Sequence, residues 1–157
     1  MRVATPSIDA RGLRVALVVS RFNHLISIRL IDGAREALFD QGLAEADLEL
    51  FWVPGAFEIP LAARQVAESG RFDAIVTLGS VIRGGTPHFD YVCRGVTDGV
   101  REVMRDSGVP VGFGVLTTDD IDQALARAGG SDGNKGGEVA LAAVEMARLR
   151  RREAVAS

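Results

Sequence analysis

Four short apolar runs, separated by segments of helical periodicity, constrain the fold of this chain more than any other feature. The runs are residues 13–19, 48–53, 74–78 and 109–116. Each run is too short for a helix of its own and is bounded by turn-forming residues, which is typical of buried strands. Strands that alternate with helices form βαβ units with right-handed crossovers. The sequence therefore predicts an α/β three-layer sandwich, in which helices flank a four-stranded parallel sheet.

The segments between the runs indicate where the helices begin and end. Apolar residues recur at helical spacing over residues 23–42, 59–70 and 91–108, and each of these segments ends at a glycine. Asn23 is a candidate N-cap for the first helix, and Tyr91 is the expected start of the third. Thr117 or Thr118 is expected to cap a short fourth helix, and a final helix should begin near Lys135. A chain of 157 residues suits a single domain spanning residues 1–157.

The charge of the chain argues against a nucleic-acid partner. The formal net charge is −3 and the pI is about 5.4, whereas binding to a phosphate backbone requires a clustered basic surface. The basic run at residues 148–152 is the exception, and at the end of a helix it complements the negative end of the macrodipole. No stretch reaches the ~18 apolar residues needed to span a bilayer. We therefore expect neither a nucleic-acid nor a membrane partner.

The chain offers few residues for metal or thiol chemistry. Cys93 is the only cysteine, and His24 and His88 are the only histidines, so a metal site built from thiolates or imidazoles could hardly be assembled. Cys93 falls in a predicted helix, where a buried small residue is the simpler interpretation. The N-terminal residues lack the apolar core of a signal peptide. We expect a cytoplasmic protein with no metal and no internal disulfide.

Unusual residues stand where the first two strands give way to helices. Because the carboxyl ends of parallel strands meet at one edge of a sheet, these junctions are expected to form one site. Phe22, at the first junction, could stack on a planar heterocycle or could instead pack the entry of the helix. Glu58, at the second, could accept hydrogen bonds from sugar or polyol hydroxyls. A carboxylate in the first turn of a helix is also explained by the helix dipole alone.

The third junction, residues 79–90, holds the strongest candidate for catalysis. Its glycines allow a ligand to approach main-chain N–H groups closely, and the helix that follows could meet an anion with its N-terminus. Arg83, Thr86 and His88 lie within six positions of each other there. Histidine is suited to proton transfer near neutral pH. The position of His88 among glycines favours catalysis over a structural role, whereas His24 is expected on a solvated helix surface.

The fourth junction supplies candidates for an anion site. Phe113 and Gly114 lie in the last strand, and Arg127 and Lys135 follow it. The planar donor fork of an arginine and the compact charge of a lysine, beside glycine-rich backbone, suit a phosphate group. Either cation alone is more often a solvated surface residue. The phosphate-loop pattern GxxxxGK[ST] is absent, and no GxGxxG follows a strand, so nucleotide binding by those routes is not expected.

The chain resembles the lumazine synthase family in five segments that span nearly its whole length: SRFN at 20–23, GAFEIP at 55–60, LGSVIRGGTPHFDYV at 78–92, GFGVLTT at 112–118 and NKGGE at 134–138. The resemblance implies a flavodoxin-like strand order. It also implies condensation of 5-amino-6-(D-ribitylamino)uracil with 3,4-dihydroxy-2-butanone 4-phosphate. Phosphate and water would be released, no metal or organic cofactor would take part, and the product would be 6,7-dimethyl-8-ribityllumazine, in the penultimate step of riboflavin biosynthesis.

The resemblance further implies a role for each junction residue. His88 would be the catalytic residue, and Gly85, Thr86 and Arg127 would bind the phosphate of the butanone. The residues that bind the ribitylaminouracil would be Phe22, Asn23, Ala56, Phe57, Glu58, Ser80, Val81, Ile82, Phe113 and Lys135.

Assembly is a further expectation from the resemblance. The family builds homopentamers with the site between neighbours, so Phe113, Arg127 and Lys135 would serve the site of the adjacent subunit. The lead segment, residues 1–11, would add a strand to a neighbour's sheet. The compact loop before the last helix resembles that of members that close into a sixty-subunit icosahedral shell, although it departs from the common pattern at Ser131 and Asp132. Riboflavin synthase is a candidate partner within such a shell.

Two other classes of function are alternatives to the enzyme. One is a non-catalytic assembly protein that keeps the shell without turnover, and the presence of Phe22, His88 and Arg127 argues against it. The other is a module that binds a flavin or lumazine without chemistry. Such a module would not require the residues expected at the phosphate.

Overall fold

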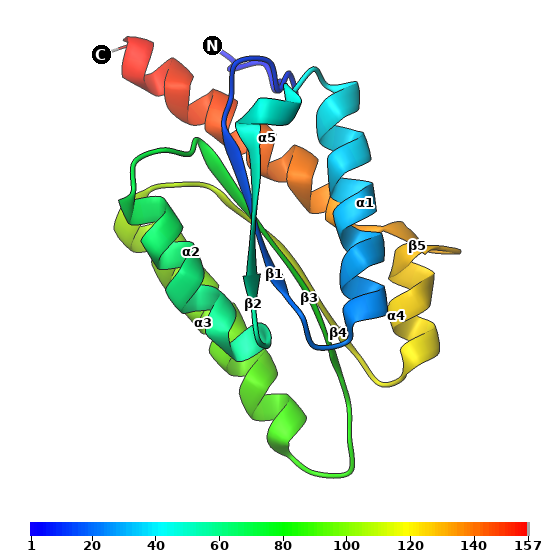
Figure 1. Ribbon diagram of the computed structural model, residues 1–157. Helices are drawn as coiled ribbons and strands as arrows, with labels where there is room; N and C mark the ends of the chain where they lie inside the picture. Colours follow the sequence, from blue (N-terminus) through cyan, green and yellow to red (C-terminus); the bar gives the residue numbers. More distant parts are fainter. Residues whose placement is uncertain (157) are drawn as a thin grey trace.

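A four-stranded parallel sheet forms the centre of the molecule (Figure 1). The computed structural model describes residues 1–156, with side chains described as far as residue 152. The strands are β1 (Val15–Ser20), β2 (Leu48–Val53), β3 (Ala74–Ile82) and β4 (Val111–Thr118). They lie in the order β2-β1-β3-β4, and each neighbouring pair is parallel. This order is flavodoxin-like, so the predicted fold class is confirmed.

Helices cover both faces of the sheet. They are α1 (His24–Asp40), α2 (Ile59–Glu68), α3 (His88–Ser107), α4 (Ile121–Arg127) and α5 (Lys135–Ala156). Figure 1 shows α2 and α3 on one face and α1, α4 and α5 on the other. Short 3-10 turns, η1 (Glu45–Asp47) and η2 (Ala56–Glu58), flank β2, and a small antiparallel pair, β5 (Ala128–Gly130) and β6 (Gly133–Asn134), connects α4 to α5.

The core has two layers because side chains alternate across the central strands. Leu17 and Val19 of β1 pack with residues of α1 and α5, whereas Ala16 and Val18 pack with residues of α2 and α3. All of β1 is buried, as expected of a central strand in a parallel sheet. Burying a large aliphatic side chain contributes about 1.5–3 kcal/mol. These layers fix the sheet, and with it the loops at its carboxyl edge.

Two helix boundaries differ from the prediction. α3 begins at His88 and not at Tyr91, so the histidine lies in the first helical turn. α4 is capped by Asp120, whose Oδ1 accepts a hydrogen bond of 2.8 Å from the backbone N–H of Gln123. The predicted caps, Thr117 and Thr118, are instead the last residues of β4. Threonine is β-branched and suits an extended strand, while aspartate is among the strongest N-caps.

Asn23 occupies the N-cap position of α1, but its side chain makes no capping hydrogen bond. Its backbone is left-handed, with φ of 57°, a conformation that asparagine tolerates better than most residues. The side-chain amide instead donates to the main-chain oxygen of Ser80 at 2.8 Å. Asn23 therefore ties the loop after β1 to the end of β3.

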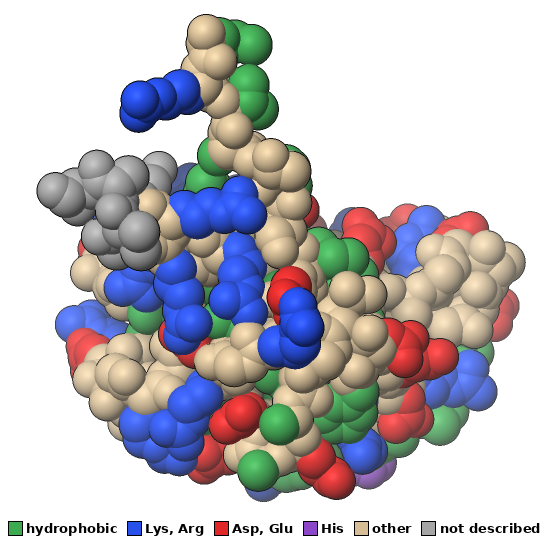
Figure 2. Space-filling model, turned by 90° about the horizontal axis from the view of Figure 1, so that it is seen from above, with side chains coloured by type: hydrophobic (Ala, Val, Ile, Leu, Met, Phe, Trp, Pro, Cys, Tyr) green, Lys and Arg blue, Asp and Glu red, His purple; other side chains and the backbone are tan. Residues whose placement is uncertain are grey.

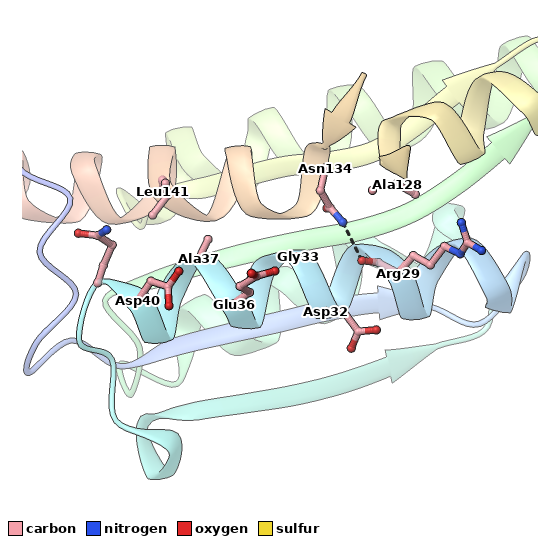
Figure 3. Close-up of a pocket in the computed structure, with 11 residues that line it drawn as sticks. Arg29, Asp32, Gly33, Glu36, Ala37, Asp40, Ala128, Asn134 and Leu141 are labelled. Carbon is pink, nitrogen blue, oxygen red and sulfur yellow. Dashed lines mark hydrogen bonds between the residues drawn. The ribbon is translucent and has the colours of Figure 1, made fainter. Parts of the chain in front are cut away.

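Glycines allow α1 and α5 to cross closely. A Cβ on Gly136 would lie 2.1 Å from the carbonyl oxygen of Leu30, and one on Gly33 would lie 2.2 Å from the Asn134 side chain. Asn134 donates through Nδ2 to the main-chain oxygen of Arg29 at 2.9 Å (Figure 3). Its Oδ1 accepts from the N–H of Gly136 at 2.9 Å. This contact fixes where the last helix begins.

The basic run near the end of the chain contacts the chain's own N-terminal lead. Arg148 donates to the main-chain oxygens of Asp9, at 2.6 Å, and of Arg11, and Arg151 pairs with Asp73 at 2.7 Å. Figure 2 shows basic side chains gathered at the end of the molecule from which a narrow segment projects. Residues 1–10 form no helix or strand within the described chain. Their pairing with a neighbouring chain stays a prediction.

Candidate active site

Three of the strand-to-helix junctions are joined by hydrogen bonds at the carboxyl edge of the sheet. The backbone N–H of Phe22, after β1, donates to the main-chain oxygen of Pro54, after β2, at 3.1 Å. The bond from Asn23 to Ser80 links the first junction to β3. Because the three strands are parallel neighbours, these loops leave the sheet at the same edge.

The three junctions enclose a cavity of about 620 Å³. This is within the roughly 300–1,000 Å³ that is usual for sites of small ligands. Its lining residues are Phe22, Gly55, Ala56, Phe57, Glu58, Ser80, Val81, Ile82, Gly84, Thr86, His88, Phe89, Tyr91 and Val92. The cavity is thus lined mainly by apolar and aromatic side chains, with a few polar groups among them.

Most of the residues that the sequence nominated are found at this cavity. The lining includes Phe22, Ala56, Phe57, Glu58, Ser80, Val81, Ile82, Thr86 and His88. Gly85 lies in the chain between two lining residues, and Asn23 contacts the site through its bond to Ser80. The structure therefore brings the first three junctions together in a single chain.

Aromatic side chains around the cavity are unusually exposed. The exposed fractions are 72% for Phe22, 63% for Phe57 and 73% for Tyr91. Large apolar side chains gathered around a hollow and left in water are typical of a surface that a ligand or another chain covers. Phe22 does not pack the entry of α1 as a buried staple, so the interpretation as a stacking surface is favoured.

Glu58 has a structural role in the isolated chain. Its Oε2 accepts a hydrogen bond of 3.0 Å from the backbone N–H of Gly55, the residue before η2, and so its side chain caps the start of this turn. This hydrogen bond gives Glu58 a structural role that needs no ligand. It does not exclude a ligand, because a carboxylate has two oxygens and can accept several hydrogen bonds at once.

His88 and Cys93 lie on the same helix but in different surroundings. His88 is an exposed residue at the start of α3 and lines the cavity. Cys93 is partly buried, and this burial raises the pKa of its thiol, with the nearby Asp90 carboxylate adding to the effect. A raised pKa disfavours the reactive thiolate. His88 is therefore the better placed of the two for chemistry.

Three nominated residues lie away from this cavity. Phe113 lines a separate apolar cavity of about 540 Å³ between β4 and α5. Arg127, at the end of α4, contacts Asp132 at 3.5 Å, and Lys135, at the start of α5, contacts Glu138 at 2.9 Å. Within one described chain, the structure does not bring these three residues to the histidine.

Some lining residues were not nominated by the sequence, namely Gly55, Gly84, Phe89, Tyr91 and Val92. The sequence predicts that α3 begins at Tyr91, which places Tyr91 and Val92 in the helix and not at the site. With the helix starting at His88, its first turn contributes side chains to the cavity wall. The signal that could have found them is the helical spacing of Tyr91 and Val92 from His88.

A third cavity, of about 580 Å³, lies between α1 and the β5–β6 pair (Figure 3). Its charged lining residues, Arg29, Asp32, Glu36 and Asp40, all belong to α1. Among the described residues, none of those that the sequence predicts for the site lines this cavity.

Among residues 1–152, no cluster of three or more histidine, cysteine or acidic side chains could hold a metal ion. No helix of the described part of the chain has both the length and the apolar character needed to cross a bilayer.

Together, the doubly wound sheet and the cavity at its carboxyl edge define a small-molecule site of the α/β type. The sequence of the chain matches the model of one protein family, 6,7-dimethyl-8-ribityllumazine synthase, over residues 12–151 of 157. The chain therefore belongs to the 6,7-dimethyl-8-ribityllumazine synthase family. This membership implies a transferase that acts on small molecules in riboflavin biosynthesis.

Proposed function

We propose that the chain condenses 5-amino-6-(D-ribitylamino)uracil with 3,4-dihydroxy-2-butanone 4-phosphate to form 6,7-dimethyl-8-ribityllumazine. Phosphate and water are released, and the reaction uses neither a metal nor an organic cofactor and takes place in the cytoplasm. The observation that carries the proposal is the cavity in which three family-like motifs meet, in a chain that belongs to the family.

The pyrimidine binds between Phe22 and the end of β3. The exposed ring of Phe22 stacks on the heterocycle. The main chain of Ser80, Val81 and Ile82 and the side chain of Asn23 bind its polar edge. Support comes from the bond between Asn23 and Ser80, which already holds these two partners at one end of the cavity.

The ribityl chain lies along η2. The backbones of Ala56 and Phe57 and the carboxylate of Glu58 bind its hydroxyl groups. All three residues line the cavity, and the capping bond to Gly55 holds the carboxylate in place. A carboxylate that is already oriented loses less entropy when it accepts bonds from a polyol.

The phosphate of the second substrate binds at the loop between β3 and α3. Gly85 and Thr86 donate to it at the N-terminus of α3, where the helix dipole favours an anion. Arg127 adds its charge from the neighbouring subunit, with Lys135 and Phe113 completing the shared site. The exposure of the aromatic residues around the cavity supports a site that another chain helps to cover.

His88 relays protons between the reacting groups. The amine attacks the ketone and forms an imine with loss of water, phosphate is eliminated, and the ribitylamino nitrogen then closes the ring with loss of a second water. Each step moves a proton that an imidazole can accept or donate. Orientation of two bound reactants can remove ~7–11 kcal/mol of barrier, and acid–base help adds a factor of ~10²–10⁴.

The working unit is a homopentamer in which residues 1–11 add a strand to the neighbouring sheet, and the pentamers assemble into an icosahedral shell. The lead is suited to exchange, because Val3 is 69% exposed and residues 1–10 form no helix or strand within the described chain. Riboflavin synthase is the candidate partner inside the shell, since it consumes the lumazine product.

The test is absorbance during incubation of the purified chain with both substrates, followed by sizing of the same sample. We expect lumazine to form well above the spontaneous background and the protein to elute as a pentamer or larger particle. If the pyrimidine binds and particles form but no lumazine appears above background, the catalytic proposal is wrong and a carrier or scaffold role replaces it.

A further inference from the structure

Arg83 lies in the loop that carries the site residues, yet its side chain has partners outside the cavity. Its Nε donates to Asp119 Oδ1 at 2.9 Å, and its Nη1 lies 3.6 Å from Asp90 Oδ1. The guanidinium carbon lies 4.4 Å from the centre of the Phe89 ring, which is within the range of a cation–π contact. Within the described chain, Arg83 is not among the residues that line the cavity.

These contacts join three segments that are separate in the sequence. Asp90 and Phe89 belong to the first turn of α3, while Asp119 follows β4 and precedes α4. The backbone N–H of Arg83 also donates to the main-chain oxygen of Thr118 at 2.9 Å. Arg83 therefore anchors both ends of the short loop, residues 84–87, between β3 and the helix.

The two glycines of that loop are unpacked. Apart from the glycine itself and its two chain neighbours, no described residue has an atom within 4 Å of the place where a Cβ would stand on Gly84 or Gly85. Glycine also leaves the backbone freer than any other residue. A loop with two unpacked glycines is mobile unless its ends are fixed, and the contacts of Arg83 fix both ends of the path from β3 to His88.

Asp119, whose carboxylate accepts the hydrogen bond from Arg83, is itself held in a fixed position. The backbone N–H of Asp119 donates to Gln123 Oε1 at 2.8 Å. The neighbouring Asp120 caps α4 by accepting from the N–H of the same glutamine. Asp119 thus stands on an ordered turn, and an arginine fork bound to it has a defined direction.

We propose that Arg83 is a positioning residue, which fixes the loop between β3 and α3 so that Gly85, Thr86 and His88 meet the phosphorylated substrate in one geometry. The proposal rests on the proposed function of the site. Groups that act by orientation lose much of their effect when they are displaced by as little as 1 Å. The pyrimidine is held by Phe22 and the end of β3, so its binding depends little on this loop.

A direct role in phosphate binding makes the opposite prediction. If Arg83 were itself the phosphate ligand, its two carboxylate partners would compete with the substrate, and Asp119→Asn would strengthen phosphate binding. If Arg83 positions the loop, Asp119→Asn removes a restraint and weakens the use of the phosphorylated substrate. The two roles therefore differ in the sign of one substitution.

The experiment measures steady-state kinetics with each substrate varied in turn. For Arg83→Ala we expect kcat to fall at least about tenfold and KM for the butanone phosphate to rise about three- to tenfold, with KM for the pyrimidine changed by less than about twofold. Asp119→Asn should shift the same constants in the same direction but less. The double variant should be no worse than Arg83→Ala alone, because both changes break one contact.

Two further variants sharpen the comparison. Arg83→Lys keeps the charge but loses the planar fork and the stacking on Phe89, so it should recover activity only in part. Arg35→Ala is the control, because Arg35 is an exposed arginine over a phenylalanine ring, Phe39, on α1 and away from the cavity. It should leave all kinetic constants unchanged.

A second readout does not depend on activity. Amide hydrogen exchange in residues 84–88 should be faster in Arg83→Ala and Asp119→Asn than in the unaltered chain, while exchange in β1 and β3 stays unchanged. The positioning role is overturned if loop exchange and the kinetic constants of Arg83→Ala match those of the unaltered chain, or if Asp119→Asn lowers KM for the butanone phosphate. If the unaltered chain makes no lumazine, the proposed function fails, and the exchange data still decide whether Arg83 holds the loop.

Discussion

A substitution of His88 should lower the rate of the reaction and leave the binding of the pyrimidine nearly unchanged. It lines the cavity from the first turn of α3, while Phe22 and Asn23 lie on the loop after β1. We expect His88→Ala to lower kcat by at least about tenfold, since acid–base help is worth ~10²–10⁴ in rate. Pyrimidine affinity should stay within about threefold, because stacking and main-chain contacts remain. Turnover rates and a pyrimidine titration of the same protein measure the two quantities.

The matched control for this substitution is the other histidine. His24 is exposed at the start of α1, and the centre of its ring lies 5.4 Å from the centre of the Trp52 ring. Within the described chain, His24 does not line the cavity. His24→Ala should leave turnover unchanged. A parallel collapse of rate and pyrimidine affinity in His88→Ala would make His88 a structural residue.

Asp132 is expected to restrain the affinity for the phosphorylated substrate. Its carboxylate lies 3.5 Å from Arg127, the cation proposed to meet the phosphate, and it would repel that phosphate. Both side chains are substantially exposed, so the effect should be that of a surface pair, about 0–1 kcal/mol. We expect Asp132→Asn to lower KM for the butanone phosphate by about two- to fivefold and to leave KM for the pyrimidine unchanged.

Salt and a second acidic residue provide the controls. The gain from Asp132→Asn should shrink as ionic strength rises, because exposed charges are screened. Asp122→Asn makes the same change of charge on α4 without the contact to Arg127, and it should have little effect. A higher KM in Asp132→Asn would show instead that the carboxylate orients Arg127 for binding.

At the scale of elements, the crossing of α1 and α5 depends on one glycine more than on its neighbour. A Cβ on Gly136 would lie 2.1 Å from the carbonyl oxygen of Leu30, whereas one on Gly137 would lie 3.0 Å from that of Gly33. Both glycines are helical, so alanine gains up to about 1 kcal/mol of helix propensity at either position. We expect Gly136→Ala to lower the free energy of unfolding by about 1–3 kcal/mol and Gly137→Ala to be near neutral.

Urea unfolding followed by circular dichroism measures the two values under identical conditions. Equal stability of the two variants would mean that the helices separate without cost at this crossing. Because Lys135 begins the same helix, Gly136→Ala should also raise KM for the pyrimidine more than Gly137→Ala does.

The elements also show how far the sequence could predict this structure. The apolar run at residues 48–53 predicted both bounds of β2 correctly, because turn-forming residues flank this run. The start of α3 was missed, since Pro87 precedes His88 and no side chain caps the helix there. The cap of α4 was missed because two threonines and Asp120 compete for one role, and only the length of β4 decides among them. The start of α4 is thus set by a local cap, and the start of α3 has no such signal.

The candidate site was predictable to the extent that it depends on sheet topology. Parallel strands bring Phe22, Glu58 and His88 to one edge, and the structure places them around one cavity. The hydrogen-bond partners were not predictable, because they depend on side-chain direction. The side chain of Asn23 donates a hydrogen bond to Ser80 and does not cap α1. The side chain of Arg83 contacts Asp119 and Asp90, which belong to two other segments.

At the scale of the whole molecule, the surface of a single chain looks incomplete. In the described chain β4 is an edge strand with a neighbour on one side. The apolar cavity beside it contains Phe113 and Met146, and Met146 is 51% exposed. An open strand edge beside an exposed apolar hollow is a place where another chain can pack. The position of Phe113, Arg127 and Lys135 away from the histidine fits the proposed sharing of each site between two subunits.

Mixed assembly tests this sharing directly. Arg127→Ala should lose activity mainly through the phosphorylated substrate, and His88→Ala should lose it through turnover. When the two inactive variants are dissociated, mixed in equal amounts and reassembled, a site that takes His88 from one chain and Arg127 from its neighbour is intact in about a quarter of random pairings. We therefore expect the mixture to recover about a quarter of the unaltered activity.

The control is the same pair of proteins mixed without dissociation, which should stay at the mean of the two variants. A double variant that carries both substitutions, reassembled with His88→Ala, should also recover nothing, because no chain then supplies the histidine. Recovery shows that two chains contribute to one site. If reassembled mixtures never exceed the mean of their components, each site lies within one chain, and Arg127 must reach the phosphate by a rearrangement of its own α4.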